Sequence, residues 1–578
     1  MIIGINIDTE NKFTKQTRYI FEHLFSVLGY PYEIVSFDDK LDFESYRIFI
    51  NYGGNRSLEK FNNYLKKGGC VIHIDSDKKT YADQLPDINY FIFDKNTEIP
   101  FFYQCKSFDP KQGEILYKYK TEDRIAVNII KKYKGHIIQI GFDIVLSTFF
   151  LLNRIEESIV TKRDKYQRFS SENSMAFQNN FLQLPVVDYY IKLLDKLIRV
   201  LIKKKNICIT KKCYWPQNKK YSICLTHDVD FIKKWDTSWF KENIISFFNN
   251  LLKFKIKDAI NKLSECLIPL SGETDPYWSF DNLISLEKEL GYKSSFYFFT
   301  DNKRYKISDK KTKKMIKNIC ENGWDVGLHS SFESYNNLKK IEIEKKSIDN
   351  ILGKPANGVR QHFLMFNPSN NWINYEKAGF NYDTTLGFAD HYGFRASTSF
   401  PYHPYNFLED KKASILEIPI IVMDGSFFHY LDYSSEEAYN STISTVNTIK
   451  ETNGICVMLW HSNSFSDDRP GWGETYYKII KNIDRSKAWV TSASEISDWW
   501  TARNKLKLIN VENKKNKIIW TFQTEKKLKH VFLKLFSINP KKIMLKGINN
   551  YKINAADETI IELKEIEEKN PFQIILKK

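Results

Sequence analysis

The chain has 578 residues, enough for several domains, and its 86 Lys and Arg against 70 Asp and Glu give a formal net charge of +16. The basic residues are spread over predicted exposed helical faces, and no nucleic-acid-binding motif accompanies them, so we expect no nucleic-acid partner. No apolar run reaches the roughly 18 residues that a membrane-spanning helix needs. The eight cysteines lie mostly inside apolar runs, which predicts reduced, buried thiols.

Residues 1–215 are predicted to form an α/β domain, because short apolar runs alternate there with helical patterns. The expected strands cover residues 2–7, 47–50, 69–74 and 136–140, and the expected helices cover residues 17–28 and 58–67. No group of residues in this part points to catalysis, so we expect a scaffolding or substrate-presenting role.

Residues 216–503 contain four apolar runs that each end in side chains able to do chemistry. The runs end in His227-Asp228-Val229-Asp230, in the segment from His329 to Glu333, in Arg360-Gln361-His362 and in His461. Among them lie helical patterns such as residues 281–290, which Gly291 caps, and strand candidates at 295–300, 381–386, 415–420 and 488–492. This alternation predicts a parallel sheet closed into a barrel, with the working groups at the carboxyl ends of its strands.

Asp228 and Asp230 are the most informative pair in the sequence. Carboxylates two residues apart beyond a buried strand point the same way, and they repel each other unless a proton or a cation lies between them. Such a pair is typical of a metal ligand beside a base, and the alternative is an ordinary turn at the end of a strand. The occurrence of four strand-end motifs in one region favours the metal site.

These motifs resemble those of the NodB-homology family of polysaccharide deacetylases, over roughly residues 219–503. The resemblance implies a distorted (β/α) barrel and a divalent metal, with Asp228 as the catalytic base and Asp230 as a metal ligand. Residues 141–154 resemble the N-terminal region that often precedes this domain in long bacterial members. The resemblance therefore implies an enzyme preceded by an extra α/β domain.

The remaining family motifs imply three supporting roles. Arg360 matches the arginine that braces the catalytic carboxylate, although the proline and aromatic residue that usually follow it are absent. His461 matches the histidine of the Leu-x-His motif and would be the general acid. Asp383 is the candidate for the acidic residue that holds His461 in its charged form.

The family's His-x-x-x-His motif is incomplete, because His329 matches it but Glu333 stands where the second histidine is expected. Zinc takes three protein ligands and an open position, so one ligand is needed besides Asp230 and His329. The third ligand is either His362, at the end of a neighbouring strand, or Glu333, one helical turn after His329. We favour His362, and hence Zn²⁺, because imidazole suits zinc, whereas Glu333 would shift the preference toward Co²⁺, Mn²⁺ or Fe²⁺.

The expected reaction is the hydrolytic removal of an N-acetyl group from a sugar. Asp228 would take a proton from a metal-activated water, and His461 would protonate the leaving amine. Tyr335, Trp372 and Trp472 follow predicted strand ends and are candidate substrate-binding residues, with a place in the core as the alternative for each.

The first residues lack a basic, apolar export signal, so we expect a cytoplasmic protein. A cytoplasmic location favours an intermediate of a surface polysaccharide or glycolipid as the carbohydrate substrate, and it leaves open a peripheral contact with a membrane or a lipid-linked sugar.

Residues 504–578 are predicted to form a small β-sandwich-like domain that binds carbohydrate or covers the barrel, with strands at 518–522, 530–535 and 560–563. Two other functions stay open for the whole chain. One is a related amidohydrolase that acts on a non-sugar amide. The other is a non-catalytic carbohydrate-binding or scaffold protein derived from a deacetylase.

Overall fold

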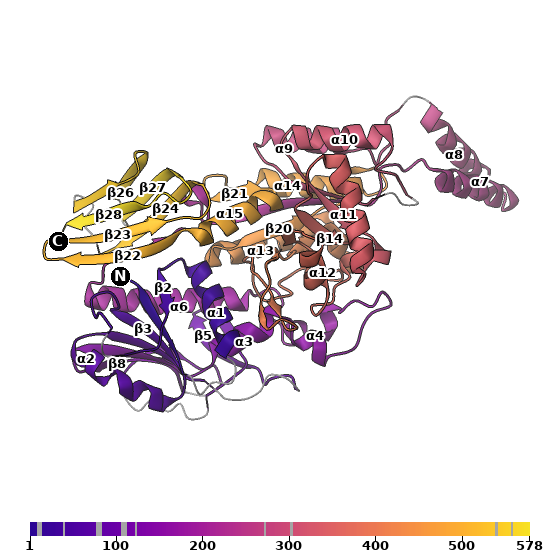
Figure 1. Ribbon diagram of the computed structural model, residues 1–578. Helices are drawn as coiled ribbons and strands as arrows, with labels where there is room; N and C mark the ends of the chain where they lie inside the picture. Colours follow the sequence, from indigo (N-terminus) through magenta and orange to yellow (C-terminus); the bar gives the residue numbers. More distant parts are fainter. Residues whose placement is uncertain are drawn as a thin grey trace.

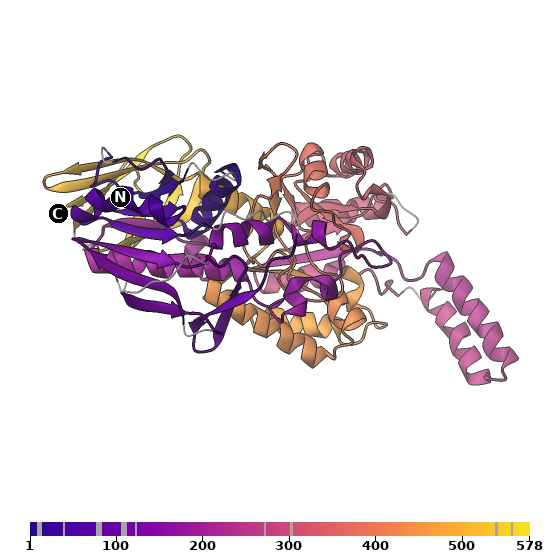
Figure 2. The same ribbon diagram turned by 90° about the horizontal axis from the view of Figure 1, so that it is seen from below.

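The structure, a computed structural model, describes residues 1–577 except 9–13, 39–40, 77–83, 106–112, 122–123, 271–272, 301–303, 538–541 and 556–558. The protein is mixed α/β, with an N-terminal sheet, a central parallel sheet and two C-terminal antiparallel sheets (Figure 1). The two chain ends lie near each other at one end of the molecule (Figures 1 and 2).

The N-terminal part folds around a seven-stranded sheet in the order β2-β1-β3-β4-β9-β8-β7. The strands are β1 (Ile3–Ile7), β2 (Tyr32–Ile34), β3 (Ile48–Tyr52), β4 (Cys70–Ile74), β7 (Glu114–Lys118), β8 (Ile125–Lys132) and β9 (Gly135–Ile140). Five of them are parallel, and β8 and β7 continue the sheet in antiparallel fashion. The four predicted strands are therefore confirmed.

The helices of this part follow the predictions less evenly. The first predicted helix is confirmed by α1 (Thr14–Leu28), whose apolar positions are buried. The second is shorter than expected, because residues 55–61 form 3-10 turns before α2 (Asn62–Lys66) begins. A long amphipathic helix, α6 (Val186–Lys205), ends at Asn206 in the left-handed conformation that stops helices.

The central sheet is parallel and has the order β18-β15-β14-β13-β12-β11-β20-β19, with β21 paired to β11. Its strands are β11 (Tyr221–Val229), β12 (Ser295–Phe298), β13 (Asp325–Ser330), β14 (Gly358–Gln361), β15 (Tyr382–Asp383), β18 (Leu416–Glu417), β19 (Val422–Met423), β20 (Ile455–Leu459) and β21 (Ala488–Thr491). The predicted alternation is confirmed, for example by α9 (Phe280–Glu289) between β11 and β12. Two of the predicted strands, at 381–386 and 415–420, are reduced to two paired residues each.

The sheet curls because one run of chain supplies both of its edges. Leu416 and Glu417 pair with β15, and Val422 and Met423 pair with β20. Between them, Ile418 N donates to Asp383 O at 2.9 Å. The first and last strands are thus joined by only four residues, which is consistent with a (β/α) barrel.

The C-terminal residues form two four-stranded antiparallel sheets with the orders β10-β24-β27-β26 and β22-β23-β28-β25. Their strands are β10 (Ile209–Lys212), β22 (Lys507–Lys514), β23 (Lys517–Gln523), β24 (Leu528–Phe536), β25 (Ile543–Lys546), β26 (Tyr551–Ala555), β27 (Thr559–Ile566) and β28 (Phe572–Lys577). The three predicted strands are confirmed. One strand of these sheets, β10, precedes the central sheet in sequence and pairs with β24.

The segment before the central sheet packs against its loops through buried charges. Glu157 forms a two-pronged ion pair with Arg395, with contacts of 2.8 and 3.0 Å, and both side chains are almost fully buried. Asp188 accepts hydrogen bonds from Thr398 and Ser399, and burial raises the pKa of Asp188 to about 7. A buried charge is costly without its partner, so these contacts fix the N-terminal part on the central sheet.

An unexpected helical hairpin follows β11. It consists of α7 (Thr237–Leu252) and α8 (Ile256–Leu267), and it projects from the rest of the chain at the end opposite the termini (Figures 1 and 2). Within the described residues, no helix has the length and apolar character needed to traverse a lipid bilayer.

Candidate metal centre

Six of the residues predicted from the sequence lie at one rim of the central sheet, where its parallel strands end. They are Asp228, Asp230, His329, Arg360, His362 and His461. The strands that carry them, β11, β13, β14 and β20, are neighbours in the sheet or separated by one strand. Because neighbouring parallel strands end at the same edge, residues far apart in sequence meet there.

Asp230, His329 and His362 form a compact group of ligand atoms, all within 4.8 Å of one another. Asp230 Oδ1 lies 3.3 Å from His329 Nε2 and 3.5 Å from His362 Nδ1, and the two ring nitrogens are 3.2 Å apart. Burial would raise the pKa of Asp230, but the adjacent His362, His329 and His461 hold this pKa well below its usual range. Asp230 is therefore ionised.

The hydrogen bonds around this group fit a divalent cation. His329 Nδ1 is 3.0 Å from Arg360 O and donates to it, so Nε2 carries the lone pair that faces Asp230. Burial lowers the pKa of His362 to about 3, which keeps its ring neutral. Asp230 Oδ1 is buried and makes no hydrogen bond within the described residues. Two imidazoles and one carboxylate are a ligand set for zinc with a position left open.

Glu333, the other candidate for the third ligand, does not belong to this group. It lies in a short 3-10 turn, residues 332–334, and its side chain is exposed. The chain makes this turn after β13 instead of the helix that would have placed Glu333 above His329. The residue that stands beside Asp230 and His329 is His362, which begins the turn after β14.

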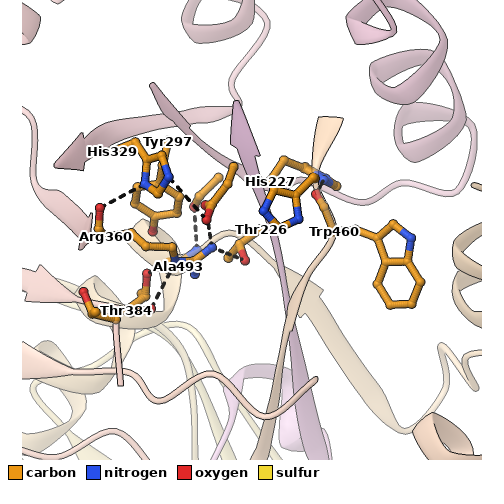
Figure 3. A network of polar contacts seen from close by, with 12 residues as sticks. Thr226, His227, Tyr297, His329, Arg360, Thr384, Trp460 and Ala493 are labelled. Carbon is orange, nitrogen blue, oxygen red and sulfur yellow. Dashed lines mark hydrogen bonds and ion pairs between the residues drawn. The ribbon is translucent and has the colours of Figure 1, made fainter. Parts of the chain in front are cut away.

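Asp228 is held by Arg360. Arg360 Nη1 donates to Asp228 Oδ1 at 3.0 Å and to Thr226 Oγ1 at 2.9 Å, and its Nε donates to Thr384 at 3.0 Å (Figure 3). The guanidinium is fully buried and lies over the ring of Tyr297, 4.5 Å from its centre. Asp228 Oδ2 is left facing the metal group, 3.8 Å from His329 Nε2.

His461 is oriented by Asp424, which corrects the prediction that Asp383 does this. Asp424 Oδ1 is 2.7 Å from His461 Nδ1, and Asp424 Oδ2 accepts the backbone N–H of His461 at 2.8 Å. Burial would lower the pKa of His461, but the charge and hydrogen bond of Asp424 raise it to about 9. Nε2 of His461 points toward the metal group, 3.9 Å from Asp230 Oδ2.

Asp383 is instead part of a buried acidic pair. Its Oδ1 accepts hydrogen bonds from the backbone and hydroxyl of Thr385, at 2.9 and 2.5 Å. Burial raises the pKa of Asp383 and that of Glu417 opposite it in the neighbouring strand. Both side chains are fully buried, so the pair belongs to the core of the sheet.

A cavity of about 260 Å³ opens beside the metal group. Besides the site residues, it is lined by the cations Arg168, Arg304 and Arg469 and by His429 and Tyr430. Among the described residues, the carboxylates that line it are Asp228 and Asp230. The rest of the lining is largely apolar and includes Phe231, Phe363 and Leu364. A few polar groups among apolar side chains are typical of a small-molecule site.

The three aromatic residues predicted to bind substrate do not line this cavity. Trp372 is core, because it is almost fully buried and donates its Nε1 hydrogen to Glu417 at 2.7 Å. Trp472 is also nearly buried, and it stacks on Phe428 behind the cavity wall. Tyr335 is half-buried after the turn that contains Glu333.

Asp424 could have been found from the sequence, since it directly follows an apolar run that ends at Met423. This is the same signal that identified the other strand-end residues. The three cavity arginines carry no such signal. Arg168 comes from the N-terminal part, where it pairs with Asp164 and donates to Tyr430 across the domain contact.

Comparison with known proteins finds a family match in the N-terminal part and distant structural likenesses. Residues 5–203 match a family of unknown function, DUF7033. No protein with a curated description matches the chain. Three similar solved structures are a polysaccharide deacetylase from Mycobacterium smegmatis, the carbohydrate deacetylase Agd3 and Puue allantoinase.

All three structural likenesses are weak. The M. smegmatis structure has 15% identity and a TM-score of 0.34, and the match covers 49% of this chain and 91% of the other. Agd3 has 9% identity and a TM-score of 0.41, with 100% and 98% covered. The allantoinase has 11% identity and a TM-score of 0.35, with 50% and 92% covered. These values do not establish a shared activity, so the functional argument rests on the site itself.

Proposed function

We propose that the protein is a metal-dependent hydrolase that removes N-acetyl groups from a sugar. The observation that carries the proposal is the convergence of Asp230, His329 and His362, within 4.8 Å of one another, beside a braced carboxylate and an oriented histidine. The curled parallel sheet supports the view that this centre lies in a distorted (β/α) barrel.

Asp230, His329 and His362 would hold the cation, and zinc fits this donor set best. A divalent cation held there would supply Lewis-acid polarisation of an amide carbonyl and a lower pKa for a water molecule. The cavity of about 260 Å³ provides room for an acetamido group next to these residues.

Asp228 would act as the general base. Arg360 occupies its Oδ1, so Oδ2 is the oxygen available to accept the proton of the attacking water. His461 would act as the general acid, because Asp424 holds Nδ1 and directs Nε2 toward the centre. As the C–N bond breaks, His461 Nε2 gives a proton to the nitrogen, and acetate and a free amino sugar leave.

The sugar would be bound by groups at the rim of the cavity. Arg304, Arg469 and Tyr430 line it and can donate hydrogen bonds to hydroxyl or acidic groups of a sugar. These residues replace the predicted aromatic contacts as the proposed substrate-binding set. An intermediate of a surface polysaccharide or glycolipid, acted on in the cytoplasm, stays our prediction for the natural substrate.

The test is acetate release from N-acetylated amino-sugar oligomers by the zinc-loaded protein. We expect turnover in the native protein and its loss in His329→Gln, while His391→Gln, at a half-buried histidine outside the cavity, serves as the matched control. Hydrolytic ring opening of cyclic amides, without acetate release from sugars, would assign the protein to the related amidohydrolases. Absence of both metal binding and turnover would assign it to non-catalytic carbohydrate-binding proteins.

A further inference from the structure

The α7–α8 hairpin carries a concentration of exposed apolar side chains. Of the 26 large hydrophobic residues that are exposed in the described chain, eleven lie between Ile244 and Ile268. Together they expose on the order of 1,000 Å² of apolar surface, more than the few hundred Å² that monomeric proteins usually show in one patch. An unpartnered surface of this size marks an interaction site.

These side chains form one stripe on each helix. On α8 the stripe is Ile256, Ile260, Leu263 and Leu267, and on α7 it is Ile244, Ile245, Phe248, Leu251 and Leu252. Spacings of three and four residues keep a stripe on one side of a helix. At about 100° per residue, the stripe is centred about 140° from the buried Asn243 on α7 and about 70° from the buried Ala259 on α8, in the same rotational sense on both helices. Because the helices are antiparallel, both stripes therefore lie on one face of the hairpin.

The end of the hairpin combines the most exposed apolar residues with lysines. Leu252 is 78% exposed and Phe254, which connects the two helices, is 89% exposed. Lys253, Lys255 and Lys257 alternate with apolar residues there, and all three are exposed. This alternation places the lysine ammonium groups beside the exposed apolar side chains at the end of the hairpin.

We propose that the hairpin docks the protein onto the surface of an anionic lipid bilayer, with its apolar face and its end in the headgroup region. Lysine ammonium groups there would contact lipid phosphates while Leu252 and Phe254 enter the acyl boundary, as in other interfacial amphipathic helices.

A second copy of this chain explains the same surface less well. A helical bundle of two hairpins would cover the stripes, but it would leave Phe254, at the connection, in solvent. In a parallel pairing the three lysines of each end would also face those of the partner. A bilayer covers the stripes, the end and the charges together.

The base of the hairpin is fixed at the rim of the candidate metal centre. The hairpin begins seven residues after Asp230, and Phe231 in the connection lines the cavity. Where the chain returns, Asp275 accepts backbone hydrogen bonds from Lys234 and Trp235 at 2.8 to 3.0 Å. Docking through the hairpin would therefore hold the cavity close to the lipid headgroups. This inference does not depend on the proposed reaction.

The first test is co-sedimentation of the full chain with vesicles of equal parts phosphatidylcholine and phosphatidylglycerol. We expect binding by the native protein and a loss of affinity on the order of 100-fold in the double variant Leu252→Ser, Phe254→Ser. The matched control is Leu408→Ser, because Leu408 is 79% exposed but lies outside the hairpin. No vesicle binding by the native protein, or an equal loss in the control, would overturn the proposal.

The second test separates charge from apolar contact. Replacing Lys253, Lys255 and Lys257 with Gln should weaken binding to these vesicles about 100-fold, with little effect on vesicles of phosphatidylcholine alone. The matched control replaces Lys310, Lys313 and Lys314, exposed lysines of α10 (Lys310–Glu321), with Gln. An equal loss in the control would contradict specific docking.

Sedimentation velocity and an activity assay complete the experiment. A dimer in the absence of lipid that the Leu252→Ser, Phe254→Ser variant dissociates would assign the surface to a second copy and overturn the proposal. Acetate release from a soluble substrate should be unchanged in the hairpin variants. Vesicle binding should in turn persist in His329→Gln, so failure of one proposal can be told apart from failure of the other.

Discussion

Two buried histidine–carboxylate pairs lie close together in the central sheet, and they do different things. His227 Nε2 is 2.9 Å from Glu287, and its Nδ1 donates to Trp460 O at 2.8 Å, so both ring nitrogens are engaged in a fully buried pair. His461 has its Nδ1 bound to Asp424 at 2.7 Å, but its Nε2 faces the cavity. Burial and an acidic partner are common to both. The open nitrogen is what makes a pair fit for proton transfer.

Alternation along β11 explains the difference. Consecutive side chains of a strand point to opposite faces, so His227 faces the surrounding helices while Asp228 faces the barrel interior. Glu287 on α9 completes the outer network with hydrogen bonds from Trp324 and Tyr476, each at 2.7 Å. One strand therefore contributes both to the core and to the site.

The difference between the two pairs is tested most strongly by removing Nε2 of His461, the ring nitrogen that faces the cavity. We expect His461→Gln to lower turnover about 10²- to 10⁴-fold, because the leaving amine would lose its proton donor. Bound zinc should be retained, because His461 is not in the ligand group. Single-turnover acetate release and metal content measure the two quantities, and unchanged turnover would remove His461 as the acid.

A substitution in the His227–Glu287 pair, in which both ring nitrogens of the histidine are engaged, should lower the stability of the fold. We expect His227→Leu to lower the free energy of unfolding by about 3–5 kcal/mol, since it leaves the buried carboxylate of Glu287 without its partner. Residual folded protein should keep its zinc. Urea denaturation followed by circular dichroism measures the loss. A large drop in the zinc content of His227→Leu with unchanged stability would contradict the structural role of the His227–Glu287 pair.

The orienting residue should have an intermediate effect. We expect Asp424→Asn to lower turnover about 10- to 100-fold, as is usual when the partner of a functional histidine is lost. Asp383→Asn is the matched control, because Asp383 is equally buried but contacts Thr385 instead of His461. An equal loss of kcat in both variants would indicate a general structural effect.

The smallest expected effect is a pH dependence of stability. Burial would raise the pKa of Glu287, but the hydrogen bonds and charge of its partners, His227 first, lower it below the usual 4.5. The pair thus stabilises the fold above pH 4.5, and this stabilisation is lost as the pH falls through the lower pKa of the folded state. The difference in unfolding free energy between native protein and Glu287→Gln should narrow on acidification. A difference in unfolding free energy that widens on acidification would contradict the lowered pKa of Glu287.

Much of the site could be predicted because strand ends are visible in a sequence. Short apolar segments precede Asp228, His329, Arg360 and His461, and parallel pairing of the strands brings their ends together. The prediction that Asp383 is the partner of His461 comes from the family resemblance alone, whereas in the structure Asp383 is buried beside Glu417. The strand predicted at 415–420 stops short of Met423, where the apolar run ends. Asp424, the polar residue that follows this run, was therefore not predicted as a site residue.

Contacts made by packing could not be predicted in this way. Whether Glu333 reaches the metal group depends on whether a helix or a short turn follows β13, and the local sequence does not decide between the two. Trp372 lies in the core, where it donates a hydrogen bond to Glu417, a residue 45 positions away in the sequence. Arg168 reaches the cavity only because the N-terminal part packs on the central sheet. The hairpin was missed because its apolar residues are exposed, contrary to the usual rule.

The most direct test of the central claim is the metal itself. We expect purified protein incubated with zinc and desalted to retain about one zinc per chain, in keeping with a three-ligand site. A crystal structure measured at the zinc absorption edge should place the anomalous peak between Asp230, His329 and His362, and Asp230→Ala should abolish both signals. Zinc retained undiminished in Asp230→Ala, or a peak located elsewhere in the chain, would contradict the account.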